Sequence, residues 1–130
     1  MSMFRDTVTI YNKYAEGGVE KWKRTVLRGV FWNSVEGAVL RKTGAASANS
    51  VVMLIPGAVA GYVKPKAWEA ISDKGGSWTV KPGDMLVRGE IPTEIVRSTR
   101  ELDGFDDVLT VTTVDDKRLG SLPHLEVSGK

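Results

Sequence analysis

The chain has 130 residues, the size of one domain, with 42% hydrophobic and 26% charged residues, a composition that excludes an intrinsically disordered polypeptide. It contains no cysteine, which excludes disulfides, thiolate metal sites and a cysteine nucleophile. The net charge is only +2, but it is unevenly spread: residues 1–35 hold six Lys/Arg against three Asp/Glu, and residues 100–130 hold four against seven. This polarity favours head-to-tail contact between identical copies, although the same charges can also be simply solvated.

The first third of the chain predicts a long β-hairpin. "DTVTIYNKY" is rich in β-branched and aromatic residues, and it places Val8 and Ile10 on one face of a strand. Gly17-Gly18 is a two-residue turn signal, and residues 19–35 form the return strand. Gly29 predicts a bulge or bend within that strand.

The middle of the chain combines a loop of small side chains with a short strand. From Gly44 to Ser50 no side chain is larger than asparagine, and an apolar segment, 51–55, follows directly. We therefore predict one β-barrel domain over residues 1–130, with 36–57 as a projecting loop and short strand within it. Such a loop has little to bury, so we expect it to be flexible.

The remaining segments are short strands, turns and helical turns. "KPKAWEAIS" predicts a helical turn, with Pro65 at its first position. The other expected elements, in chain order, are a turn at Gly75-Gly76, a strand 78–80, a turn 81–84, a strand 85–88, a short helix 99–102, a strand 108–114 and a strand 125–127. Short strands at close spacing predict an all-β fold, a small antiparallel barrel or sandwich with one or two short helices.

No residue pattern predicts an enzyme, a cofactor site or a metal site. His124 is the only histidine, and no serine lies in a nucleophile-elbow pattern that would complete a hydrolytic triad. The acidic doublets Asp106-Asp107 and Asp115-Asp116 flank the expected strand 108–114. They fit either solvated turn residues or a weak calcium site.

Nucleic-acid binding is the alternative of a different class. Small β-barrels bind single strands through aromatic platforms and basic grooves. This chain has four tryptophans with lysines nearby, which are Trp22, Trp32, Trp68 and Trp78. They fall in different expected elements, and each also suits a hydrophobic core.

We expect a protein that is soluble and stays in the compartment where it is made. The first ten residues include the charged pair Arg5-Asp6 and lack the apolar core of a signal peptide. The longest apolar run is interrupted by Pro56 and by glycines, and it is too short to span a bilayer.

Four segments together resemble a family of small structural proteins of tailed phages and prophages. They are "FRDTVTIYNKY" (4–14), "YVKPKAWEAI" (62–71), "WTVKPGDMLVRGEI" (78–91) and "FDDVLTVTTVDDKRLGSLPHLEVSGK" (105–130). The chain resembles the head-closure, or stopper, proteins of the head-tail connector in particular. The resemblance covers nearly the whole chain in order, although no single motif in it is diagnostic.

The resemblance implies a virion protein of the neck, made in the host bacterial cytoplasm. Such a protein is a small β-barrel that forms a ring, typically of six copies, between the portal or adaptor proteins and the tail terminator or other tail proteins. It helps to retain packaged DNA, with which it makes at most non-specific contact. A tail-tube or tail-completion subunit is the alternative within virions.

In the family that the chain resembles, a loop projects toward the channel. The corresponding residues here are expected to contact the channel or a neighbouring subunit, with a plain surface loop as the alternative: Arg41, Lys42, Thr43, Gly44, Ala45, Ala46, Ser47, Ala48, Asn49 and Ser50. Arg41 and Lys42 would face DNA phosphates through non-specific attraction.

Overall fold

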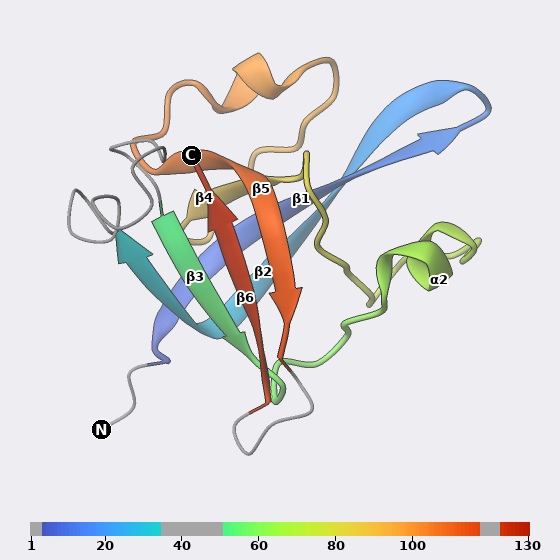
Figure 1. The fold of residues 1–130 in the computed structure, drawn as a ribbon. Coiled ribbons are helices and arrows are strands. Elements are labelled where there is room, and N and C mark those ends of the chain that lie inside the picture. The colour runs from blue at the N-terminus through green and yellow to red at the C-terminus, as the bar shows by residue number, and fades with distance from the viewer. Residues whose placement is uncertain (1–3, 35–50, 118–122) are drawn as a thin grey trace.

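The computed structural model describes residues 4–34, 51–117 and 123–130, and Figure 1 shows their arrangement. The elements in chain order are β1 (Asp6–Glu16), β2 (Val19–Ser34), β3 (Val51–Pro56), α2 (Pro65–Glu69), β4 (Met85–Arg88), the 3-10 helix η1 (Thr99–Leu102), β5 (Val108–Asp116) and β6 (His124–Gly129). The six strands form a closed barrel in the order β1-β2-β3-β6-β5-β4, and β4 returns to pair with β1. All of the pairs are antiparallel, so the predicted all-β barrel is confirmed.

The β1–β2 hairpin has the predicted turn and the predicted bulge. Gly17 and Gly18 have φ of 60° and 79°, the left-handed pair that a two-residue hairpin loop requires. Gly29 has φ of 82°, and the β1–β2 register shifts beside it, between Asp6 and Thr7. The extra residue bends β2, which lets its last part leave β1 and pair with β3.

The main core lies inside the barrel. Val8 and Ile10 are fully buried there, which confirms the predicted apolar face of β1. Every strand contributes to this cluster, whose buried members are Val8, Ile10, Leu27, Val30, Trp32, Met53, Ile55, Trp78, Val80, Leu86, Leu109, Val111, Leu125 and Val127. Alternation along each strand places these side chains on one face, so closing the sheet encloses them.

A second, smaller cluster covers the outer face of β1 and β4. It contains Tyr11, Met85, Val87, Ile95 and Leu102, and its last two members come from the segment that connects β4 to β5. The Tyr11 hydroxyl donates to the Thr93 carbonyl at 2.6 Å, and burial raises the pKa of Tyr11. The connection therefore packs on the barrel wall instead of extending into solvent.

The predicted strand at 78–80 is wrong. Apart from a single parallel bridge between Tyr62 and Trp78, this segment forms no strand, although all three of its residues are buried. Trp78 exchanges backbone hydrogen bonds with Gly61 and Val63. The backbone of Thr79 is held by a side chain from β1: the Thr79 N–H donates to Asn12 Oδ1, and the Thr79 carbonyl accepts from Asn12 Nδ2. An amide side chain has replaced a neighbouring strand as hydrogen-bond partner.

The other predicted elements in the described residues are confirmed, some with different bounds. Pro65 occupies the first turn of α2, and η1 lies at 99–102 as expected. Strand β5 extends to Asp116, so the second acidic doublet is part of the strand instead of flanking it. The loop predicted within 36–57 lies outside the described residues as far as position 50, and β3 follows it.

The turn before η1 is held by one carboxylate. Glu101 Oε2 accepts from the backbone N–H groups of Val96, Arg97 and Ser98 at 2.8–3.0 Å, and the Ser98 side chain caps the helix. These bonds hold the pKa of Glu101 below its usual value of 4.5. Val96 is left 76% exposed at this ordered turn.

We expect the turn at 96–98 to loosen in acid and in the Glu101→Gln variant. The depressed pKa means that the carboxylate stabilises the turn above pH 4.5, and this contribution disappears as pH falls through the folded-state pKa. Amide hydrogen exchange at positions 96–98 measures the effect, and it should accelerate in the variant at neutral pH. Equal protection in both proteins would contradict this role.

Candidate assembly interface

The β1–β2 hairpin extends well beyond the barrel wall. Strand β4 pairs with β1 only from Val8 to Tyr11, whereas β1 and β2 stay paired out to Glu16 and Val19. Figure 1 shows this outer part as a blue ribbon that projects beyond the other strands. At its tip, Val19 is 58% exposed.

A buried polar network fastens the hairpin where it leaves the barrel. Asp84 is fully buried and accepts from Asn12 Nδ2 at 2.8 Å, from the Lys13 N–H at 3.0 Å and from Lys81 Nζ at 2.9 Å. Lys81 Nζ also donates to the Lys13 carbonyl at 2.6 Å. These two side chains satisfy the backbone of Lys13, where β1 has run past the end of β4.

An aromatic contact supports the underside of the hairpin. Trp68 of α2 is fully buried and meets the Tyr14 ring edge-on, with ring centroids 5.7 Å apart. Lys74 Nζ lies 4.8 Å from the Trp68 ring and 5.2 Å from the Tyr14 ring, a cation–π arrangement. The helix therefore braces the hairpin against bending.

A surface hollow of about 360 Å³ lies along the β1 side of the hairpin. Four charged side chains line it, those of Lys13, Glu20, Glu69 and Lys81, together with Tyr14, Ala15 and Gly18. Lys13 and Glu20 form an ion pair at 3.2 Å across exposed side chains, which contributes little to stability. Because charged side chains border this open hollow, we treat it as a surface that can contact another macromolecule.

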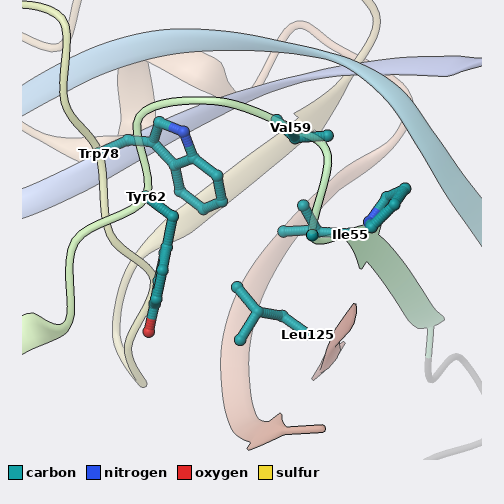
Figure 2. A pocket seen from close by; sticks show the side chains of 7 residues that line it. Ile55, Val59, Tyr62, Trp78 and Leu125 are labelled. Atoms are coloured by element: carbon teal, nitrogen blue, oxygen red, sulfur yellow. The ribbon is translucent and has the colours of Figure 1, made fainter. Parts of the chain in front are cut away.

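A smaller cavity lies at the other side of the barrel, and Figure 2 shows its apolar lining. Ile55, Val59, Tyr62, Trp78 and Leu125 converge around about 30 Å³. Trp78 Nε1 donates to the Ala60 carbonyl at 2.7 Å, so the indole is anchored. This space has room for no more than one or two water molecules and is too small for a metabolite.

The residues first considered for chemistry do not converge. His124 Nε2 lies 4.0 Å from Glu126 Oε2, and Glu126 pairs with Lys117 at 3.3 Å. Within the described residues, no group of three or more histidine and acidic side chains is arranged to hold a metal ion, the two acidic doublets included. No described helix is long and apolar enough to cross a bilayer.

The tryptophans do not form a shared platform. Trp32, Trp68 and Trp78 are 6%, 0% and 1% exposed, so none offers a ring face for stacking a base. Trp22 is half-buried against the outer cluster. The candidate contact loop from Arg41 to Ser50 lies outside the residues that the structure describes.

Sequence reasoning predicted the hairpin, but not that it projects beyond the barrel or that Asn12 and Asp84 fasten it. The available signals were polar residues at positions where strand alternation points inward, and "KPGD" preceding β4. A buried carboxylate at a turn of this kind is usually hydrogen-bonded to nearby backbone N–H groups.

The described residues define a small closed β-barrel with a braced, projecting hairpin. The chain belongs to a family of unknown function, DUF6751, whose profile matches residues 3–130. Neither a curated protein nor a solved structure matches it significantly.

Proposed function

We propose that this protein is a structural subunit of the head-tail connector of a tailed phage, acting as the head-closure ring between the portal or adaptor and the tail. The proposal begins from the resemblance of four segments that span most of the chain. Its mechanism is assembly by shape and self-association, with no substrate and no cofactor. Packaged DNA is retained because the ring and its neighbours close the channel.

The projecting hairpin is the observation that carries the proposal. A hairpin that extends past its own sheet buries little of its surface within its own subunit and is only marginally stable in isolation. In this protein it is nonetheless held in place, by the bond of Asp84 to the Lys13 N–H and by the contact of Trp68 with Tyr14. Rigid presentation of a polar strand pair suits contact with a neighbouring subunit, because little ordering entropy is then lost on binding.

Inactivating the gene in the lysogen that carries it tests the proposed position. We expect induced cells to contain tails and separate heads, with a large fraction of the heads emptied of DNA. Electron microscopy of the lysate and nuclease sensitivity of the DNA measure the two effects. Expression of the intact gene from a plasmid is the control and should restore joined particles.

The tail-tube alternative gives a different result. A missing tube or tail-completion subunit leaves filled, nuclease-resistant heads and no normal tails. Joined particles that form normally without the gene would contradict both roles.

A further inference from the structure

One edge of the projecting hairpin is an unused strand edge. The Lys13 N–H donates to Asp84, and the Thr7 carbonyl accepts from the Gly89 N–H. The odd-numbered residues of β1 therefore point their backbone N–H and C=O groups away from β2. By antiparallel alternation, their partners on β2 turn their own N–H and C=O groups to the opposite edge. These partners are Glu20, Trp22, Arg24, Val26 and Arg28.

No strand among the described residues pairs with that edge. Strand β3 pairs with β2 only from Phe31 to Ser34. Within the described part of the chain, the segment from Glu20 to Arg28 therefore presents a row of backbone donors and acceptors that no strand pairs with, which is a template for another strand. The edge of β1 differs, because Asp84 and Lys81 already occupy its exposed groups at Lys13.

The charge of this edge selects its partner. Strand β2 carries four basic residues, Lys21, Lys23, Arg24 and Arg28, against one acidic residue, Glu20. Lys21 and Arg28 already pair with Glu16 and Glu90 of the same chain. Lys23 and Arg24 form no ion pair within the described residues, and their side-chain nitrogens donate to the Ser77 and Ile91 carbonyls. Pairing of β2 with a second β2 would therefore oppose like charges, which disfavours a symmetric dimer through this edge.

The same chain carries an acidic strand edge. Strand β4 pairs with β5 only from Val108 to Thr110, and Val111 exchanges backbone bonds with Gly83 and Asp84. From Thr112 to Asp115 no described strand lies on that side of β5. Strand β5 contains two aspartates and no basic residue, and Asp115 lies 3.7 Å from the Lys117 ammonium that follows the strand.

We infer that the β2 edge of one copy pairs with the β5 edge of the next copy, as an intermolecular β-sheet. The two edges differ, so the contact is heterologous and repeats head to tail until a ring closes. A single short strand pair is weak, and ring closure strengthens it because every copy then engages both of its edges. The inference deepens the proposed ring function by naming the surfaces that meet.

Cysteine crosslinking of the purified protein tests this contact. The natural chain has no cysteine, so every crosslink reports on introduced thiols. Glu20 and Thr113 are exposed, and we expect the Glu20→Cys, Thr113→Cys double variant to give a ladder of multimers with a short bismaleimide. Each single variant should stay monomeric, because its only thiol faces a neighbour without one.

A matched pair controls for random collision. Lys66 lies exposed on α2, and a Lys66→Cys, Thr113→Cys variant should give at least about fivefold less multimer than the edge pair. An equal ladder from this control, or no ladder from the edge pair, overturns the inference. A strong dimer from Glu20→Cys alone would also overturn it, because that product reports β2–β2 pairing.

Charge reversal in the edge-pair background gives an independent readout. Lys21→Glu and Asp115→Lys should each reduce the multimer yield about fivefold or more, since each places like charges across the contact. Mixing the two reversed proteins should restore the yield, because each β2 edge then meets a β5 edge of opposite charge. Reduction without restoration on mixing overturns the assignment.

The crosslinking experiment can fail or succeed independently of the proposed position in the phage neck. Crosslinking is measured on purified protein, whereas the neck position is measured on phage particles. A ladder with normal particles after gene inactivation would keep the pairing and remove the neck role. The opposite outcome would keep the neck role and remove the pairing.

Discussion

Replacing Asp84 with alanine is expected to lower the free energy of unfolding by about 3–5 kcal/mol, the cost typical of removing one partner from a buried ion pair. The carboxylate is fully buried and accepts from Asn12, Lys13 and Lys81. The substitution removes an acceptor from the fully buried Asn12 amide, and it removes the ion-pair partner of Lys81, whose side chain is 21% exposed. Because a domain has only about 5–15 kcal/mol of net stability, the variant should be close to unfolding.

Urea denaturation followed by tryptophan fluorescence measures this loss. Asp73→Ala is the matched control, since Asp73 is exposed and accepts one bond, from the Gly75 N–H at 3.0 Å. Its effect should stay within about 0.5 kcal/mol. If the two variants were equally stable, the buried network would not be what fastens the hairpin. Faster amide exchange at Lys13 in Asp84→Ala would locate the damage at the hairpin base.

Replacing Trp78 with alanine is expected to lower the free energy of unfolding by about 3–5 kcal/mol, the cost typical of truncating a buried aromatic side chain. The side chain is 1% exposed, its ring lies 5.2 Å from that of Tyr62, and its Nε1 donates to the Ala60 carbonyl. The chain also packs closely here, since a Cβ added at Gly61 would lie 2.9 Å from the Gly76 carbonyl. Truncation would therefore leave a cavity that this tightly packed backbone fills poorly.

Trp22→Ala provides the comparison for Trp78→Ala. Trp22 packs half-buried on the outer cluster, so its truncation exposes less apolar surface than that of Trp78. It should therefore lower the free energy of unfolding by less. Thermal unfolding of both variants by circular dichroism ranks them. A larger loss of stability in Trp22→Ala than in Trp78→Ala would mean that the outer cluster, and not the barrel interior, contributes most to the stability of the fold.

Residues within one segment were enough to predict most of the strands. Alternation in "DTVTIYNKY" places Val8 and Ile10 on one face whatever lies opposite them, because side chains alternate along any strand. Gly17-Gly18 predicts the turn because both positions need positive φ, and Gly29 predicts the bulge for the same reason.

The segment at Trp78 shows where local reasoning fails. "WTV" has high β-propensity, and propensity describes a preference for a half-buried pleated surface, without specifying a partner. In the folded protein the partner is the side chain of Asn12, which is 67 positions away from Thr79 in the sequence. A strand needs a neighbouring strand, and nothing near Trp78 in the sequence indicates that an amide side chain takes that place.

The sequence alone likewise could not predict the β2 edge as a candidate interface. Charge counts indicated a positive front and a negative rear, but they did not show that the positive charges lie on a strand edge with no partner. That edge exists because β3 pairs with β2 only from Phe31 onward. Strand length is a local property, whereas the extent of pairing depends on where other strands begin and end.

The amino-acid sequence by itself determined the all-β class, the hairpin turn, the bulge and the two short helices, because each follows from the backbone preferences and periodicity of a few consecutive residues. Only the tertiary structure decided that the barrel closes through β4 and β1, that Asp84 holds the hairpin, and that part of the β2 edge is paired with no described strand. These features depend on contacts between distant segments, such as Asn12 and Asp84, which lie 72 positions apart. Such contacts form only when burial of the whole core brings the segments together.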